Sequence, residues 1–493
     1  MKKLVSLVLA LIMVLSMASI AGAEDVVALT WAMGCGATGP IDNAMVLEEL
    51  NKMSSEKIGV TCNIEYMTND QMLNSIQNGE VYDIYYTCSW LNNTTDRISE
   101  GIFADVKPYL ENVPGLVAEM TQDVWDLATH PDGSIYAIPV KKDYATMNFI
   151  YYPSALAEEL GFTIPDKVAS WDEMTEFLKA WKATLPENQY PVNIGGAPAG
   201  LESSFDFISR TAQIGLVFGD EEAKVVTIFD DPDIMDRYRT MYKWYQAGLV
   251  NPDAATITET SVDGDKERIN FVQAWPGYDY TVANGWPTKM TCYFGPNLSV
   301  DTVQGSMNAL SVTLEEDEAR MIAALKYLEL CYVDQLFLDT MRYGVQGYHW
   351  NYVTEEQSPA CAGGVLRTQV GSDNYNPWGF SQPAYFNTSI AVSEDQIAGL
   401  APAPVFEQYD MYYAEVANNA KVSTMNGFVW DNSQWTAELA EITNIYAEYS
   451  ANYKCGVTNI DDVLPEMMDK LNAAGLQDLI ADAQAQLDAH LGK

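Results

Sequence analysis

The sequence predicts an α/β fold built from two lobes. Its 493 residues are too many for one ordinary hydrophobic core, so the chain is expected to divide. Short strand-like runs alternate with helical segments from the start of the chain, which is typical of sheets covered by helices. The composition, 48% hydrophobic and 19% charged residues, is that of a globular protein.

Three strand-like runs near the start of the chain are separated by two helical segments. The second run alternates apolar and polar residues as a half-buried strand does. In the first helical segment, Val46, Leu47, Leu50 and Met53 fall on one face. Because strands joined through helices run parallel, this β-α-β-α-β series predicts a parallel sheet with helices on both faces. The expected strands are residues 26–31, 60–66 and 81–87, and the second helix covers 71–77.

A second α/β region follows, and its helices carry end signals. Ser170 has the position of an N-cap for a helix over residues 171–182, with Glu173 completing a capping box. Another helix begins at Pro232 and ends at Gly248. The remaining expected elements are strands over 135–139, 146–152, 269–274 and 306–312, and helices over 232–247, 315–332 and 460–490, the last broken by a Gly-Leu turn.

The N-terminus has the pattern of a signal peptide. Lys2 and Lys3 precede an apolar stretch over residues 4–20, and small residues follow at 21–23. We expect cleavage after Ala23, which sets residues 1–23 apart from the fold. No later stretch reaches about 18 apolar residues, so the rest of the chain is not expected to span a membrane. The expected location is extracytoplasmic, either secreted, periplasmic or at the cell surface.

The net charge of −41 limits the classes of partner. Such a surface repels nucleic-acid phosphates and anionic lipid headgroups, so neither is expected to bind. The cysteines number seven and form no CxxC motif, and an odd number leaves at least one unpaired. We expect scattered buried thiols, while one or two disulfides stay possible in an oxidising compartment.

The sequence lacks the motifs of common catalytic and metal sites. Its three histidines, His130, His349 and His490, form no HxH or HExxH pattern. Nucleophile-elbow, phosphate-loop and dinucleotide-binding motifs are also missing. The Asp-rich segments 230–233 and 263–265 do not match a calcium loop and are expected to be solvated loops or a helix N-terminus. We therefore expect no catalytic residue, no metal and no cofactor.

Aromatic and amide side chains follow several predicted strands. In a parallel α/β sheet, ligands bind beyond the carboxyl ends of the strands. A sugar offers apolar faces to flat rings and hydroxyl rims to Asn, Asp or Glu, within mostly apolar walls. Any one ring could equally be a core residue, so the joint placement carries the prediction. The candidates are Trp31 and Met33, then Ser89, Trp90, Asn92 and Asn93, then Trp275, Tyr278 and Tyr280, and finally Tyr348, His349, Trp350 and Trp378.

Several segments, in order along the chain, are similar to those of one protein family. They are LNK at 50–52 with KIGV at 57–60, GEVYDI at 79–84, GIFADV at 101–106, GSIYAIP at 133–139, YGVQGYH at 343–349, LNAAGL at 471–476 and QAQLD at 484–488. Together they make the chain resemble the family-1 extracellular solute-binding proteins of carbohydrate ABC importers, which include maltose-binding protein, and most closely the lipoprotein branch.

The resemblance implies a two-lobed periplasmic-binding-protein fold of the maltose-binding-like type II, with a hinge and an interlobe cleft. It implies a monomer that captures a sugar and delivers it to ABC permease subunits, with no enzymatic activity. Asp143 and Tyr144 fall at the hinge by position. The implied N-terminal lobe comprises residues 24–143 and 297–345, and the implied C-terminal lobe comprises 144–296 and 346–493.

Two departures and two alternatives accompany this interpretation. The lipoprotein branch has a cysteine directly after its signal peptide, whereas Glu24 stands here, so a lipid anchor is not settled. Gln346 and Trp350 stand where the branch favours Glu and Tyr. The same fold could instead bind a peptide, amino compound or polyol. A peptide or amino-acid site should show an arginine or a helix N-terminus for the ligand carboxylate, and the candidates are Arg97, Arg210 and Arg342. A glycosidase needs only two suitably placed carboxylates, and 68 acidic residues leave that open.

Overall fold

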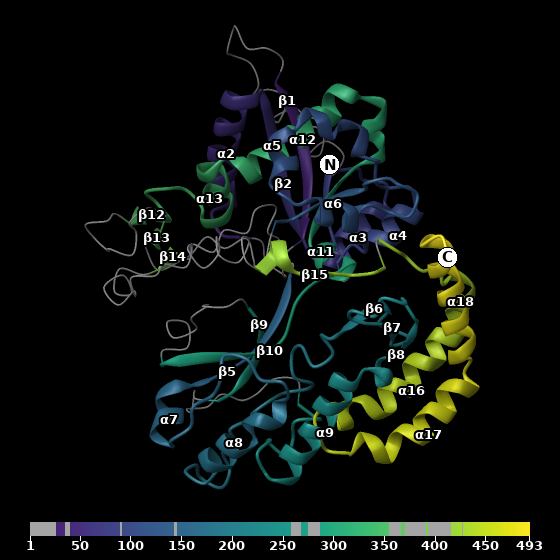
Figure 1. The fold of residues 1–493 in the computed structure, drawn as a ribbon. Helices are drawn as coiled ribbons and strands as arrows, with labels where there is room; N and C mark the ends of the chain where they lie inside the picture. Colours follow the sequence, from purple (N-terminus) through teal and green to yellow (C-terminus); the bar gives the residue numbers. More distant parts are fainter. Residues whose placement is uncertain are drawn as a thin grey trace, which may run out of the picture.

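The chain forms two lobes joined by long strands (Figure 1). The computed structural model describes residues 26–34, 40–88, 91–141, 145–257, 268–274, 286–353, 366–369, 391–392, 416–425 and 427–493. The ribbon of Figure 1 runs from the first lobe, which contains β1 to β4, through β5 into the second lobe, and returns through β10. The C-terminal helices lie along the outer side of the second lobe.

The first lobe is built on a five-stranded sheet of order β2-β1-β3-β11-β4. Strand β1 runs parallel to β2 from Val27, opposite Val60, to Gly34, opposite Met67, and it also runs parallel to β3. The predicted parallel arrangement of the first three strands is therefore confirmed, and β11 adds antiparallel pairs with β3 and β4. The strands are β1 (Val27–Gly34), β2 (Val60–Met67), β3 (Ile84–Thr87), β4 (Ala137–Pro139) and β11 (Met307–Leu310).

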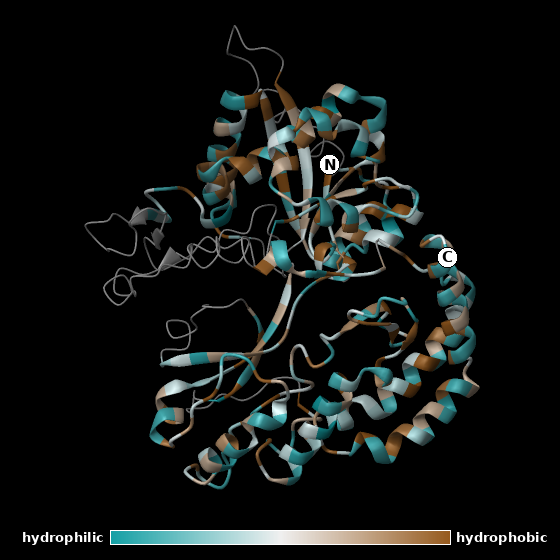
Figure 2. Cartoon of the chain, in the orientation of Figure 1, coloured by the Kyte–Doolittle hydropathy of each residue, from teal (hydrophilic) through white to brown (hydrophobic). Residues whose placement is uncertain are grey.

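Helices with one apolar face cover this sheet. Helix α2 (Asn43–Ile58) buries Val46, Leu50 and Met53, as predicted. Helix α12 (Glu318–Val333) buries most of its length, and its contacts reach both β1 and α2. Figure 2 shows hydrophobic residues concentrated on the strands of this lobe. The other helices are α3 (Asn69–Gln77), α4 (Thr94–Ser99), α5 (Pro114–Ala118), α6 (Gln122–Ala128), α11 (Val300–Val303) and α13 (Gln335–Tyr343).

The second lobe is built on a sheet of order β15-β10-β5-β9 with a small antiparallel sheet, β6-β7-β8, beside it. Strand β5 is central because it pairs with β10 on one side and β9 on the other. The strands are β5 (Thr146–Pro153), β6 (Phe205–Ser209), β7 (Ile214–Val217), β8 (Val226–Thr227), β9 (Asn270–Gln273), β10 (Thr288–Leu298) and β15 (Lys421–Val422). A third small sheet comprises β12 (Trp350–Val353), β13 (Leu366–Gln369) and β14 (Ala391–Val392).

Helices α7 (Ser154–Glu159), α8 (Thr175–Lys182) and α9 (Pro232–Gln246) pack on the second lobe together with three C-terminal helices. In the last of these, Leu476, Leu479, Ala483 and Leu487 recur at helical spacing and are fully buried. Figure 2 shows the resulting alternation of hydrophobic and hydrophilic residues along this layer. The C-terminal helices are α16 (Thr436–Lys454), α17 (Ile460–Ala473) and α18 (Leu476–His490).

Several predicted boundaries were wrong by a few residues, and three of these differences have a visible cause. Strand β3 begins at Ile84. Just before it, the Asp83 side chain accepts the Thr30 backbone N–H at 2.7 Å, so a side-chain oxygen takes the place of a backbone acceptor between the strands. The predicted helix over 171–182 begins with a 3-10 turn, Trp171–Met174, although the Ser170–Glu173 capping box is present. Helix α12 begins three residues late because Asp317 is its N-cap and accepts the Arg320 N–H.

The two lobes have separate hydrophobic cores. The first contains buried residues between 29 and 149 and between 298 and 341, with Ala274, Cys292, Val416 and Ala417. The second contains buried residues between 150 and 271 and between 425 and 487, with Tyr293. The predicted lobe boundaries stay a prediction. Residues 346–350, predicted for the C-terminal lobe, contact the first lobe: His349 Nε2 lies 3.4 Å from Asp42, and Trp350 donates to the Gly344 carbonyl at 2.7 Å.

Within the described ranges, no helix is long and apolar enough to cross a bilayer. The five cysteines in those ranges are all buried, and none is bridged to another of them. Burial raises the pKa of the Cys455 thiol to about 11. Cys35 and Cys361 lie outside the described residues. Asp231 is the N-cap of α9 and accepts two backbone N–H groups, so the Asp-rich segment 230–233 is a helix N-terminus, as predicted, whereas 263–265 lies outside the description.

Candidate binding cleft

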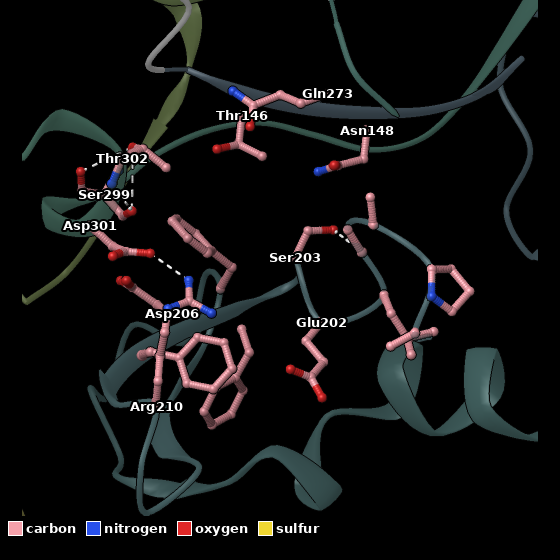
Figure 3. A pocket seen from close by; sticks show the side chains of 18 of the residues that line it. Thr146, Asn148, Glu202, Ser203, Asp206, Arg210, Gln273, Ser299, Asp301 and Thr302 are labelled. Carbon is pink, nitrogen blue, oxygen red and sulfur yellow. Dashed lines mark hydrogen bonds and ion pairs between the residues drawn. The ribbon is translucent and has the colours of Figure 1, made fainter. Parts of the chain in front are cut away.

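A cavity of about 370 Å³ lies where the two lobes meet (Figure 3). Its floor is the start of β5 and the end of β9, and its walls are loop 197–203 and strand β6 of the second lobe. The first lobe contributes Ser299, Asp301 and Thr302 at the beginning of α11, a helix that packs on α6. Both lobes therefore supply surface to one cavity, which is the arrangement of an interlobe binding site.

Two polar side chains on the floor have unpaired atoms. Thr146 and Asn148 are two residues apart on β5, so they lie on the same face of the strand. Asn148 is only 3% exposed, and among the described residues neither its Nδ2 nor the Thr146 Oγ1 has a hydrogen-bond partner. Gln273 of β9 lies opposite Asn148 and also lines the cavity. Figure 3 shows the Asn148 amide directed from the strand into the cavity.

The loop over Asn148 depends on a glycine. Gly200 has φ +68°, a left-handed conformation that side chains rarely adopt. A Cβ at this position would lie 2.5 Å from both Asn148 Oδ1 and Tyr293 Oη. Tyr293 in turn donates to the Ala199 carbonyl at 3.4 Å. The loop therefore packs closely on the floor and holds the Asn148 side chain in place.

The two cations among the described residues of the lining are already paired. Arg210 forms an ion pair with Asp301 across the two lobes, and its guanidinium lies 4.3 Å from the Phe207 ring. Lys454 lies 2.6 Å from Glu202, which also accepts a hydrogen bond from Tyr238 Oη at 2.7 Å. These contacts balance two of the three carboxylates in the lining.

The third carboxylate, Asp206 on β6, is 3% exposed. Its pKa is raised to about 7, chiefly by burial and also by the nearby Asp301, while Ser423 and Arg210 act in the opposite direction. The described residues of the lining therefore carry little net charge at neutral pH, although the whole chain is strongly acidic.

Asp206 is expected to make the protein less stable as the pH rises. Its pKa in the folded state is about 7, above the unfolded value of about 3.9. Between these values only the folded state holds the proton, so the free energy of unfolding should fall on the order of 3 kcal/mol from pH 4 to 7 and then level off. Asp206→Asn should not show this fall. Urea unfolding at pH 5, 6, 7 and 8 measures the difference, with Asp461→Asn at an exposed site as the control. If the free energy of unfolding depends on pH in the same way in wild type and Asp206→Asn, Asp206 is not the source of the fall.

The predicted site residues that the structure describes lie away from this cavity. Trp31 and Met33 are buried in the first core, where Trp31 packs edge-on against Tyr327 at 6.3 Å. Asn92 and Trp350 are also buried, and they donate to the Tyr86 and Gly344 carbonyls. In this structure these four side chains make core contacts and offer a ligand almost no surface.

Of the other predicted residues, Tyr348, His349 and Asn93 are described, and the rest lie outside the described residues. Tyr348 is 55% exposed beside the buried His349, and Asn93 accepts the Asp96 N–H at the start of α4. The remaining candidates lie outside the described residues, and their roles stay predictions: Ser89, Trp90, Asp143, Tyr144, Trp275, Tyr278, Tyr280 and Trp378.

Sequence reasoning missed the floor and walls of the cavity, although one signal was present. Strand β5 has the sequence TMNFIYYP and is otherwise buried and apolar, so Thr146 and Asn148 are polar exceptions on one face. Arg210 was considered only as a receiver for a carboxylate. Loop 197–203 has no aromatic residue that could have marked it as a binding element.

The comparison with family models decides the family. The model described as bacterial extracellular solute-binding protein matches residues 46–355, which is more than half of the chain. The chain belongs to this family. A second model, a domain of unknown function (DUF3502), matches residues 424–492, the region of α16 to α18. The resemblance seen in the sequence is confirmed.

Other members of the solute-binding protein family match almost the whole chain. A carbohydrate ABC transporter substrate-binding protein of Streptococcus pneumoniae is 21% identical, covering 90% of this chain and 88% of that protein. The crystal structure of the N-glycan transport solute-binding protein NgtS of Streptococcus pneumoniae has 19% identity and a TM-score of 0.76, covering 95% and 99%. A human-milk-oligosaccharide (HMO) binding protein from Bifidobacterium longum infantis has 17% identity and a TM-score of 0.61, covering 94% and 99%. These likenesses confirm the predicted two-lobed α/β fold.

Proposed function

We propose that this solute-binding protein captures an oligosaccharide in the interlobe cleft and delivers it to the membrane subunits of an ABC importer. The observation that carries the proposal is the cavity at the lobe junction, whose floor offers unpaired polar atoms on a strand shared by both lobes. The matched relatives are named for carbohydrate, N-glycan and HMO binding. The N-terminal signal pattern supports an extracytoplasmic location, and the expected state is a monomer.

Capture is expected to involve closure of the two lobes about β5 and β10. NgtS matches this chain with a TM-score of 0.76 in one crystal structure, and with 0.67 and 0.65 in its complexes with Man1GlcNAc and Man5GlcNAc. Because the three structures are of one protein, the different TM-scores support a difference in conformation among them. The same freedom in this chain would let the cleft close over its ligand.

A peptide or amino-acid ligand is less well supported. Arg97 forms an ion pair with Glu100 at 3.0 Å, and Arg342 lies 5.3 Å from the Tyr343 ring. Arg210 lines the cleft but is paired with Asp301. A ligand carboxylate would have to displace Asp301 to reach this guanidinium.

The protein is proposed to bind without turnover. The cleft contains Glu202, Asp206 and Asp301, but two of these carboxylates are engaged in ion pairs. Glycoside hydrolysis needs one carboxylic acid and one available carboxylate on either side of the bond. Intact recovery of a bound glycan tests this point directly.

A thermal-shift screen of the chain without residues 1–23 tests the proposed function. The probes are Man5GlcNAc, kestose, an alginate trisaccharide, trialanine and single amino acids. A ligand present at 100 times its Kd stabilises the native state by about 2.7 kcal/mol, so a bound sugar should raise the Tm by several degrees. Mass spectrometry should recover that sugar intact. A shift with trialanine or an amino acid alone would overturn the sugar assignment, and cleavage of the glycan would overturn the carrier role.

A further inference from the structure

We propose that Asn148 is the polar anchor of the cleft, donating its unpaired Nδ2–H to an uncharged oxygen of the ligand. This inference rests on the proposed function and adds which residue holds the sugar and which charge class of sugar fits. Its starting point is an energetic anomaly. A buried amide nitrogen without a partner is destabilising, and native structures rarely keep one.

The surroundings of Asn148 explain why a ligand would be its partner. Its neighbours in the sheet, Phe294 on β10 and Gln273 on β9, pair through the backbone and leave the side chain directed into the cavity. Gly200 closes over its Oδ1, because even a Cβ there would come within 2.5 Å. The amide is therefore confined between the strand and loop 197–203, and a confined donor in a cavity loses little freedom when it binds an acceptor.

The location of Asn148 on the hinge strand has a second consequence. Strand β5 begins at the lobe junction and pairs with β10, which leads back to the first lobe at Ser299. A ligand held on this strand touches the part of the molecule that both lobes share. It can therefore engage Asn148 before the lobes close, and closure can then add contacts from the walls.

The charges in the lining select an uncharged ligand. An NH2 group can donate to any oxygen acceptor, but a buried carboxylate also needs a cation nearby. Among the described residues that line the cavity, the cations are Arg210 and Lys454, and both are paired with acids. A uronic acid placed at Asn148 would add a negative charge beside Asp301, Glu202 and Asp206. A neutral sugar adds none.

Asn148→Leu separates binding from stability. The substitution keeps a similar volume and removes the unpaired donor, so the Tm of the ligand-free protein should be unchanged or higher. The Kd for Man5GlcNAc or kestose, measured by isothermal titration calorimetry, should weaken roughly tenfold or more. The matched control is Thr291→Val on β10, which removes another unpaired buried polar group outside the cavity lining and should leave the Kd unchanged.

Four outcomes would count against the proposal in different ways. Wild-type affinity in Asn148→Leu would overturn the anchor. Tighter binding of an alginate trisaccharide than of the neutral sugars would overturn the charge assignment. If Asn148→Leu lowers the Tm, the smaller Asn148→Ala, which also lacks a donor, decides, and wild-type affinity there would also overturn the anchor. If wild type binds no sugar at all, the proposed function fails first and this inference fails with it.

Discussion

Replacing Trp171 with alanine is expected to lower the free energy of unfolding of the second lobe by about 4 kcal/mol. Trp171 is 1% exposed and lies at the centre of an aromatic group in the second core. Its ring is 4.3 Å from that of Phe271, 5.2 Å from that of Tyr293 and 6.1 Å from that of Trp244, all between ring centroids. Alanine would leave a large cavity, which rigid neighbours cannot fill. Urea unfolding followed by circular dichroism measures the loss.

The matched control for Trp171→Ala is Trp31→Ala in the first core, where the tryptophan is equally buried. Because the two cores are separate, each variant should shift the transition of its own lobe. Trp171→Ala should also weaken sugar binding, since Tyr293 supports loop 197–203 over the cleft. Equal shifts of one shared transition in both variants would show that the lobes unfold as a single unit.

The sequence was sufficient to predict the lobes because their elements follow local rules. Apolar periodicity located α2 and β1, and a Ser-Glu capping box located the turn at Trp171. The misplaced boundaries have tertiary causes. Strand β3 begins late because Asp83 bonds to Thr30, which is 53 residues away, and no local pattern reveals that contact.

The lining of the cavity was harder to predict because the same residue types occur in cores and in binding sites. Trp31 follows the rule that aromatics at strand ends line a site, yet it packs against Tyr327 from α12. Asn148 violates the rule that buried strands are apolar, and it faces the cavity. A polar exception in an apolar strand is therefore a second signal that sequence reasoning can use, because burying an unpaired amide has a cost.

Replacing Asp83 with alanine is expected to destabilise the first lobe by about 3 kcal/mol. Its side chain is 9% exposed and binds Arg320 through two bonds, of 2.6 and 2.8 Å. It also accepts the backbone N–H and the hydroxyl of Thr30 on β1, at 2.7 and 3.0 Å. Alanine leaves the Thr30 N–H and most of the guanidinium without partners. Arg320 is about one-third exposed, so water compensates in part, and the loss should be at the lower end for a buried pair. Urea unfolding measures it.

Asp461→Ala provides the control for Asp83→Ala, since Asp461 also binds an arginine, Arg239, through two bonds of 2.8 and 2.9 Å. Both side chains of this ion pair are almost half exposed, so the expected loss is below about 1 kcal/mol. Similar losses in the two variants would contradict the importance of burial.

The double variant Asp83→Ala/Trp171→Ala then tests the hinge. If the lobes are separate bodies joined by β5 and β10, the two losses should add within about 0.5 kcal/mol. A larger coupling would mean that the cores support each other through the hinge strands, and closure over a sugar would then require a change in both cores rather than a rotation between them.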